Sequence, residues 1–294
     1  MRKVAIVSIG LCSISVALAQ AQGPVPPPKV LVIFREYVKP GKSGTLHEKT
    51  EAAFVQAVER AKWPEHYLAV NSLTGPTRAL FLFGYESLEA WENDIQATAK
   101  NTALTAGLDR AGIADGELLS STDGGTFLYR EDLSFAAPLN IAEMRYFSIV
   151  AVHVRPGHSS EYEEMIKLWN DARTKAKVDV HLAAYQIYAG GSSLLTYLNF
   201  TPLKSLAGLE ASNAANAKAV DEALGEEGLK KRNDLMASSV ESVERQLFIF
   251  SPKMSYPPDA WVTADPAFWK PKPTKAAAMT SSGAKKENPK PAGN

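Results

Sequence analysis

The chain carries the same local pattern twice, and this repetition restricts its fold more than any other feature. VKPGKSGTLHEK begins at Val38, and VRPGHSSEYEEM begins at Val154. Each segment follows an apolar run and contains a basic residue, then Pro-Gly, then a polar stretch typical of a helix start. Such internal similarity predicts two copies of one supersecondary unit.

Longer segments repeat in the same order. HYLAVNSLTGPTRALFLFGYESLEAWE from His66 resembles HLAAYQIYAGGSSLLTYLNFTPLKSLAGLE from His181, and LYREDLSF from Leu128 resembles LFIFSPKMSY from Leu247. In each copy the pattern predicts a strand, a helix, a hairpin, a longer helical stretch and a final strand. The order β-α-β-β-α-β, with helices on one face of an antiparallel sheet, is ferredoxin-like.

The first copy is expected to begin with a strand over 30–38 and the second with a strand over 145–154. Thr45-x-x-Glu48 and Ser160-x-x-Glu163 have the spacing of capping boxes, so we expect helices to start there. Longer helical stretches are predicted over 88–118 in the first copy and over 203–243 in the second.

Several predicted strands are apolar on both faces. ALFLF at 79–83 and LFIF at 247–250 do not alternate with polar residues. Helices can cover only one face, so the other face must meet a second sheet, which the second copy supplies. The predicted fold class is therefore α+β, with tandem duplicated ferredoxin-like units packed sheet to sheet within one chain.

The strand, the Pro-Gly turn, the acidic helix start and the hairpin together resemble the dimeric α+β barrel superfamily, which includes antibiotic-biosynthesis monooxygenase-like and stress-responsive barrel proteins. The resemblance covers 30–135 and 145–256. It implies a barrel that is completed inside one chain, and therefore a monomer with an internal pseudo-dimer. It also implies a site in a cavity between the sheet and the helices or between the sheets. Because the superfamily hosts unrelated chemistries, the resemblance does not name a substrate.

The N-terminus is typical of a secretory signal peptide. Arg2 and Lys3 precede an uncharged run over 4–19 that ends in a small-x-small cleavage site at 17–19. We therefore expect export to the periplasm or the medium, with no membrane span after cleavage; an uncleaved anchor is the alternative. Cys12, the single cysteine of the chain, lies within this segment, so the mature protein would have no thiol.

The C-terminal segment is rich in proline, lysine and alanine without a period, which predicts a disordered tail whose anchors are Trp261, Phe268 and Trp269. The whole chain balances 32 Lys and Arg against 32 Asp and Glu, so no basic face for nucleic acid is expected. The predicted organisation is a signal peptide (1–21), a proline-rich linker (22–29), a first half-barrel (30–137), a second half-barrel (143–256) and the tail (257–294).

Motifs for common hydrolytic chemistry are missing from the sequence. It contains no HExxH and no GxSxG, and no Asp, Glu and His residues occur at the sequence spacing of metal ligands. We therefore predict no metal site. No cofactor is predicted from the residues either; haem enters only through the resemblance, because some members of the superfamily bind it.

Candidate site residues are polar groups on otherwise apolar strands. His153 lies within an apolar strand, and His66 aligns with His181 at the start of a strand, so His153 and His66 are the catalytic candidates. Arg35 and Tyr37 share one strand face, while side-chain alternation places the intervening glutamate on the other face. The residues expected to line a ligand cavity are Arg35, Tyr37, Asn71, Trp91, His181, Tyr185 and Asn199.

Each candidate also has a structural explanation. A histidine at a strand boundary is often a surface residue, and an aromatic at these spacings is often part of the core. Asn199 stands between Leu198 and Phe200, so its amide needs hydrogen-bond partners in any environment.

The sequence favours a binding protein for a small apolar or aromatic molecule, because its candidate residues are amides, tyrosines and single histidines. The alternative is a monooxygenase-like oxidoreductase that acts on a phenolic or quinol substrate, either without a cofactor or with haem. A purely structural role, with the tail as a tether, is a third hypothesis.

Overall fold

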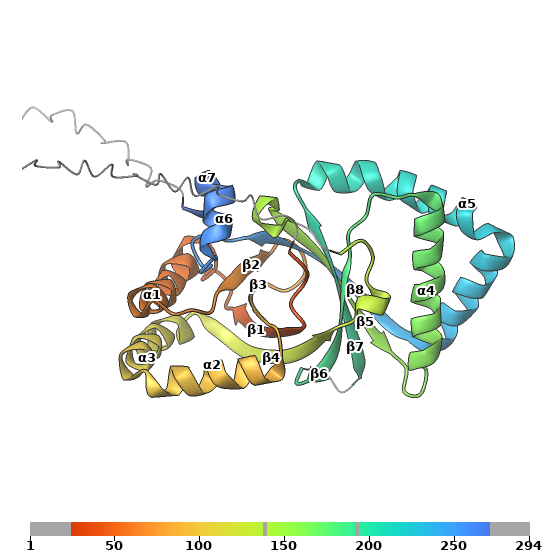
Figure 1. Cartoon of the computed structure of the whole chain (residues 1–294). Coiled ribbons are helices and arrows are strands. Elements are labelled where there is room, and N and C mark those ends of the chain that lie inside the picture. The colour runs from red at the N-terminus through yellow and green to blue at the C-terminus, as the bar shows by residue number, and fades with distance from the viewer. Residues whose placement is uncertain (1–24, 138–139, 192–193, 271–294) are drawn as a thin grey trace, which may run out of the picture.

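The computed structural model describes residues 25–137, 140–191 and 194–270. The strands of this part form one closed antiparallel barrel in the order β1-β3-β2-β8-β5-β7-β6-β4, with helices around the outside (Figure 1). The α+β class is thereby confirmed. The predicted signal peptide and residues 271–294 of the predicted tail lie outside the described residues.

The strands and helices alternate along the chain much as the repeated pattern predicts. The strands are β1 (Val30–Val38), β2 (Tyr67–Ser72), β3 (Arg78–Tyr85), β4 (Leu119–Tyr129), β5 (Tyr146–Val154), β6 (Ala183–Ala189), β7 (Leu195–Leu203) and β8 (Val240–Phe250). The helices are α1 (Thr45–Ala61), α2 (Leu88–Lys100), α3 (Thr102–Gly116), α4 (Ser159–Ala176), α5 (Leu206–Ser239), α6 (Asp259–Ala264) and α7 (Pro266–Trp269), with short 3-10 turns η1 (Glu131–Leu133) and η2 (Ile141–Glu143).

The two halves of the barrel have the same internal strand order, β4-β1-β3-β2 and β8-β5-β7-β6. The halves meet along both edges, where β2 pairs with β8 and β4 pairs with β6. The two sheets expected to face each other are therefore hydrogen-bonded into one continuous barrel, which leaves no free sheet edge among the described strands.

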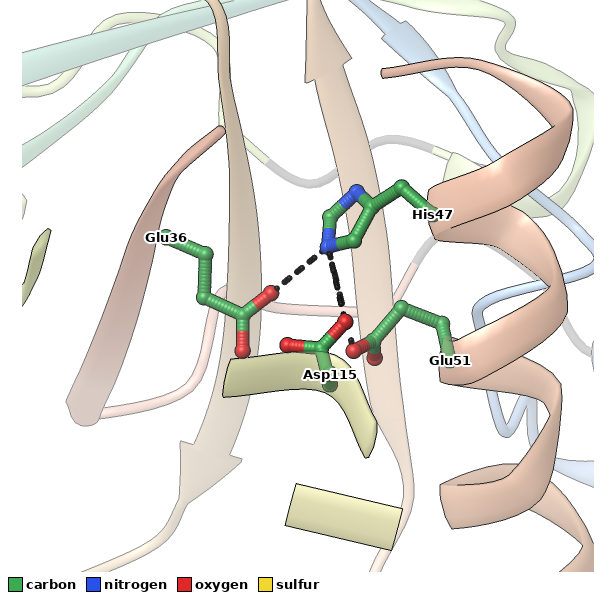
Figure 2. Close-up of side chains that lie close together, drawn as sticks. All are labelled: Glu36, His47, Glu51 and Asp115. Carbon is green, nitrogen blue, oxygen red and sulfur yellow. Dashed lines mark hydrogen bonds and ion pairs between the residues drawn. The ribbon is translucent and has the colours of Figure 1, made fainter. Parts of the chain in front are cut away.

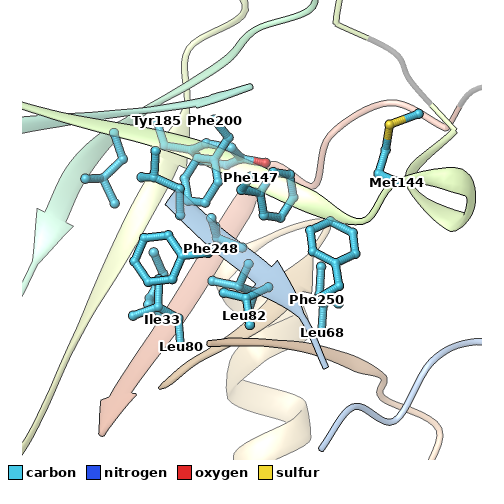
Figure 3. Close-up of a cluster of buried hydrophobic side chains, with 14 of the residues drawn as sticks. Ile33, Leu68, Leu80, Leu82, Met144, Phe147, Tyr185, Phe200, Phe248 and Phe250 are labelled. Carbon is cyan, nitrogen blue, oxygen red and sulfur yellow. The ribbon is translucent and has the colours of Figure 1, made fainter. Parts of the chain in front are cut away.

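The inside of the barrel is filled by apolar side chains from both halves. Alternation along β1 points Leu31 and Ile33 inward, and the same rule brings in Phe147 and Ile149 from β5. Aromatic residues gather in this core, and Phe147 contacts Phe250 with ring centroids 4.7 Å apart (Figure 3). The apolar outer face of the segment at 79–83 is explained by the helices, because Ala79 and Phe81 pack with residues of α1 and α3.

Helices cover the outer surface of each half separately. Helices α1 and α3 lie over the first half, and α4 and α5 lie over the second half (Figure 1). Each layer encloses its own apolar cluster, one around Ala69, Phe81 and Leu104 and the other around Tyr162 and Tyr197. The described residues thus form three cores, one within the barrel and one under each helix pair.

The repeated Pro-Gly has a backbone cause. Gly41 has φ 77° and Gly157 has φ 85°, the left-handed region that an L side chain rarely adopts. In both halves this glycine turns the chain from the end of a strand into a helix. Helices α1 and α4 also end alike, at Lys62 with φ 48° and at Lys177 with φ 51°.

The two predicted capping boxes are wrong. The residue before α1 is Gly44 and the residue before α4 is His158, and neither contributes a side-chain cap. Because the turn starts each helix earlier than expected, Thr45 and Ser160 already lie within the first turn. The carboxylate of Glu163 accepts hydrogen bonds from other partners.

The helical stretch expected over 88–118 is divided. It breaks at Asn101, whose side chain accepts a hydrogen bond from Leu104 N at 3.0 Å and so starts α3. Helix α5 is one long element with a kink at Gly225, where φ is 66°. In the described part of the chain, no helix combines the length and the hydrophobicity that crossing a membrane requires.

The predicted start of the disordered tail, residue 257, is too early in the chain. Helices α6 and α7 occupy this segment and lie against the barrel (Figure 1). Trp269 is 2% exposed, and its Nε1 donates to Ala142 O at 2.9 Å. Burial of a large indole and its hydrogen bond hold the segment in place.

Candidate functional site

A wide cavity opens at the end of the barrel where β1 and β5 begin, with a volume of about 870 Å³. Its walls are aromatic, aliphatic and proline side chains, including Phe147, Phe200 and Leu82, and helix α6 covers one side with Trp261. This volume is within the usual range for pockets that bind small molecules, roughly 300–1,000 Å³.

Three of the predicted site residues meet in the wall of this wide cavity. They are His66, His181 and Tyr185. His66 stacks on Tyr256 with ring centroids 4.7 Å apart, and its Nδ1 is buried without a hydrogen-bond partner among the described residues. The Tyr185 hydroxyl donates to Pro28 O at 3.0 Å, and burial raises the pKa of this phenol.

The carboxylates that line the wide cavity are not matched by Lys or Arg among its described lining residues. Glu86, Glu143 and Asp259 are its acidic lining residues, and no Lys or Arg belongs to the described lining. Glu143 lies at the rim, where Lys204 Nζ donates to it at 2.7 Å. A negatively charged ligand would therefore find no Lys or Arg partner on the described walls.

A narrow cavity of about 170 Å³ lies at the opposite end of the barrel interior. It brings together three other predicted residues: Arg35, Tyr37 and His153. The alternation of side chains along β1 and β5 puts all three on the inner face, as expected for the first two.

Several polar groups of the narrow cavity are bonded to one another, although Arg78 Nε is buried without a hydrogen-bond partner among the described residues. Arg35 is paired with Asp123, and His153 Nδ1 lies 2.9 Å from Thr196 Oγ1. Arg78 donates to Tyr37 Oη at 3.1 Å. With a small volume and paired groups, this cavity is better suited to holding the barrel end together than to binding an organic molecule.

The remaining candidates line neither cavity. Asn71 lies on the outer face of β2 with its Nδ2 3.5 Å from Met254 Sδ, and Asn199 lies on the outer face of β7, hydrogen-bonded to Tyr162. Trp91 is half-buried on α2. The sequence identified these as polar or aromatic positions but could not say which strand face or helix side would meet a cavity.

A third polar site, which the sequence analysis did not assemble, is buried between the barrel and the helices of the first half. It consists of Glu36 from β1, His47 and Glu51 from α1, and Asp115 from the last turn of α3 (Figure 2). We call these four residues the β1–α1 cluster. All are at most 5% exposed.

Local structure explains how the cluster forms. Alternation on β1 turns Glu36 away from the barrel interior and toward α1. His47 and Glu51 are four residues apart, so they share one face of α1. Asp115 arrives from a distant part of the chain, and Thr50 Oγ1 donates to its Oδ1 at 2.7 Å.

The atoms of the cluster surround a common centre. His47 Nε2 lies 3.0 Å from Glu36 Oε2, 3.4 Å from Asp115 Oδ1 and 3.9 Å from Glu51 Oε1. The side chains converge from three elements in Figure 2. Glu51 Oε1 is buried without a hydrogen-bond partner in the described structure.

Burial and mutual repulsion perturb the acids of the cluster. Desolvation, followed by the charges of Glu36 and Asp115, raises the pKa of Glu51 from its usual 4.5 to about 10. Desolvation likewise raises the pKa of Glu36, although the hydrogen bond from His47 opposes this effect. Both acids therefore resist ionisation in the folded protein without a cation.

The sequence contained part of the signal for this cluster. Glu36 had been placed opposite its neighbours on the strand, and the His-x-x-x-Glu spacing on α1 was visible. Nothing in the sequence indicated that Asp115 would join them, because that contact depends on how α3 crosses α1.

Comparisons with known proteins reveal similarity in fold but not in sequence family. No protein-family profile and no curated protein matches the chain. A protein provisionally assigned as a monooxygenase from Fusobacterium nucleatum subsp. nucleatum ATCC 25586 is similar in structure, with a TM-score of 0.50 and 15% identity over 76% of this chain and 93% of that chain. This similarity supports the monooxygenase-like barrel fold that the sequence resemblance implied.

Two further solved structures align less well. An anthrone oxidase-like protein has a TM-score of 0.48 and 12% identity over 76% of this chain and 92% of that chain. A chlorite dismutase variant from Candidatus Nitrospira defluvii, in complex with cyanide, has a TM-score of 0.44 and 10% identity over 80% of this chain and 95% of that chain.

Proposed function

We propose that the wide cavity binds a small apolar or aromatic molecule. The observation that carries this proposal is a volume of about 870 Å³ enclosed by aromatic and aliphatic side chains, with charged lining groups that are all acidic. Such walls favour an uncharged or cationic ligand, because burying apolar surface stabilises the complex and an anion would lack a partner.

Haem does not fit the described lining of either cavity. Its two propionates are held best by Lys or Arg, and the described lining of the wide cavity offers only His66 and His181 as basic residues. The narrow cavity contains Arg35 and Arg78, but its volume of about 170 Å³ is too small for a porphyrin. The lining of the wide cavity therefore favours a ligand without anionic groups.

Binding can be tested with two matched tryptophan variants. Trp261 covers the wide cavity from α6, whereas Trp91 is half-buried on α2 and lines neither cavity. We expect W261A to weaken binding of a hydrophobic fluorescent probe by about tenfold, since losing an aromatic contact can cost more than 1 kcal/mol. W91A should leave the affinity unchanged.

Native mass spectrometry of protein purified without refolding would complement this assay by detecting a retained ligand. Equal probe affinity in W261A, W91A and the wild type, with no ligand retained, would contradict the proposal. Near-ultraviolet circular dichroism should show that W261A keeps its fold, because Trp261 also contacts Trp269 at 5.2 Å between centroids.

A second candidate function is oxidation of a phenolic or quinol substrate, and the observation that favours it is His66. Its ring lines the wide cavity, and its Nδ1 makes no hydrogen bond within the described chain, so the imidazole is not committed to another group and could serve as a general base. A quinol would then transfer two electrons and two protons to oxygen, which yields a quinone and hydrogen peroxide.

Oxygen uptake with hydroquinones tests this second candidate. H66Q should reduce the rate by at least about a hundredfold if His66 is the general base. H158Q is the control, because His158 lies at a distant turn beside Glu161. Uptake that is absent, or equal in both variants, would leave binding as the function.

We also propose the finer points of origin and cellular context. A tandem duplication of a ferredoxin-like unit is supported by three features that both halves share. They are the strand order, the Pro-Gly turn and the lysine with left-handed backbone angles at the end of the first helix. The N-terminal pattern supports export to the periplasm or the medium, which N-terminal sequencing of the mature protein would test.

A barrel that closes within one chain supports a monomer, testable by light scattering.

A further inference from the structure

We propose that the β1–α1 cluster binds one divalent first-row transition-metal ion, of the manganese, iron(II) or zinc class. This proposal is independent of the ligand cavity. The cluster lies on the outer side of the sheet, between the barrel wall and helices α1 and α3, whereas the wide cavity opens at the end of the barrel.

The geometry is close to that of a coordination sphere. One ligand atom from each of the four residues can be chosen so that all lie within 4.8 Å of one another. Around a tetrahedral zinc ion, with bonds of about 2.0–2.2 Å, neighbouring ligand atoms are about 3.3 Å apart. The separations from His47 Nε2, which run from 3.0 to 3.9 Å, bracket this value.

Charge gives a second reason for a cation. In the described structure, each ion pair that involves a carboxylate of the cluster leads to His47, and no Lys or Arg joins them. Asp115 adds its charge in the last turn of α3, where the helix dipole is itself negative. The three buried acids can therefore all ionise beside one imidazole only if a further positive charge joins them.

The orphaned oxygen of Glu51 points to the same conclusion. The residue is 2% exposed, yet its Oε1 lacks a hydrogen-bond partner within the described residues. An unpaired buried carboxylate oxygen costs free energy. In Figure 2 this side chain is directed toward His47 and Asp115, where a bound ion would contact it.

The donor set selects the class of metal. An imidazole nitrogen with carboxylate oxygens suits manganese, iron and zinc. Calcium prefers six to eight oxygen ligands, and magnesium usually keeps several waters. All four residues are at most 5% exposed, so the site has little room for extra ligands or waters. A buried ligand set that includes an imidazole therefore disfavours calcium and magnesium.

A closed site implies a structural role. The ion would connect strand β1 with helices α1 and α3, which otherwise meet through apolar contacts such as Leu104 and Ala57. A metal that binds the folded state and not the unfolded state raises stability by mass action. The first half of the barrel would then be more stable with metal than without it.

The test uses the full chain without a polyhistidine tag. Elemental analysis should find about one metal per chain in protein purified without chelator. The metal-free protein is then titrated separately with Zn²⁺ and Mn²⁺ by calorimetry and thermal melting. We expect a one-to-one complex and a higher melting temperature, and added Co²⁺ should give the visible absorption of a four-coordinate ion.

Matched variants separate the cluster from surface sites. E51Q and D115N each keep the side-chain shape and remove one charged ligand, so affinity should fall by at least about tenfold, as it does even for partners outside the ligand shell. E59Q is the control, because Glu59 is an exposed acid on the same helix.

Three outcomes would overturn the proposal. The first is a wild type that retains no metal and whose melting temperature does not respond to added metal. The second is equal metal affinity in E51Q and E59Q. The third is a metal stoichiometry that changes when exposed acids are replaced. If E51Q fails to fold, D115N and the wild-type cobalt spectrum still decide the question. Retention of metal with loss of probe binding in W261A would separate this site from the cavity.

Discussion

Between β1 and α1 lie three carboxylates and an imidazole, whereas between β5 and α4 the matching space is filled by tyrosines and aliphatic side chains. Glu36 is the seventh residue of its strand and pairs with Ala79; Val152 is the seventh residue of its strand and pairs with Tyr197. Tyr162 stacks on Tyr197 with ring centroids 4.5 Å apart.

The two halves therefore have the same backbone arrangement and opposite interiors under the first helix. An apolar filling is sufficient for the fold, because the second half uses one. The polar filling of the first half exchanges hydrophobic stabilisation for charge burial, which rarely stabilises a protein by itself. This difference is the reason to look for a ligand in the first half.

The largest effect is expected in the apolar half. Y162A removes a side chain that is 1% exposed and stacked on Tyr197, so it should lower the free energy of unfolding by about 3–5 kcal/mol. Urea denaturation measures this value. A loss below about 1 kcal/mol would mean that the second half has no tightly packed core under α4.

Converting the polar half to the apolar type is the second test. In metal-free buffer with chelator, E36V, H47L, E51L and D115L combined should raise the free energy of unfolding by about 1–4 kcal/mol, as replacement of a whole set of buried ionic groups often does. Urea titrations of this variant and the wild type give the difference. Destabilisation would show that the β1–α1 cluster contributes to folding without a metal.

The pH dependence of the two halves should differ in sign, first through Glu51. The pKa of Glu51 is raised to about 10 in the folded state, so the folded protein keeps a proton that the unfolded chain releases above about 4.5. Stability of the metal-free protein should thus fall as pH rises through this window, by up to about 1 kcal/mol per pH unit. E51Q should reduce this slope and leave the part that comes from Glu36, whose pKa burial also raises; identical slopes would show that Glu51 is ionised in the fold.

In the second half Glu163 has compensating partners and should behave oppositely. Arg130 Nη1 donates to it at 2.8 Å and Tyr197 Oη at 3.0 Å, and the hydrogen bond from Arg130 lowers the pKa of Glu163. Its contribution is present above the usual carboxylate pKa and is lost as pH falls through the lowered value.

The matching variant is E163Q, which should cost about 1 kcal/mol at neutral pH because the pair is partly exposed. The cost should disappear in acid, where the wild-type carboxylate is protonated. Urea titrations at neutral and acidic pH measure both values. A cost that persists in acid would assign the effect to packing rather than charge.

Much of the fold was predictable because its signals are local. The strand over Val30–Val38 agrees with the prediction, and the alternation that put Arg35 and Tyr37 on one face holds in the barrel. The predicted helix start was wrong where two local patterns competed. Thr45 and Glu48 have the spacing of a capping box, but the turn at Gly41, which has left-handed backbone angles, starts the helix first.

The candidate site was less predictable because cavities are made by contacts between distant segments. His66 and His181 were singled out together, and both line the wide cavity. Asn71 and Asn199 have equally suggestive sequence settings, but both point to the outside of the barrel, Asn71 toward Met254 and Asn199 toward Tyr162 of α4. Trp269, read as an anchor of a disordered tail, is buried against the barrel.

What the sequence alone determined was the repeated unit and the faces of the strands, because each depends on residues a few positions apart. The tertiary structure decided the rest. Closure of the barrel opened a cavity at one end, and the crossing of α3 over α1 brought Asp115 to Glu36. Those contacts join segments far apart along the chain, and only the packing of the whole molecule determines which of them form.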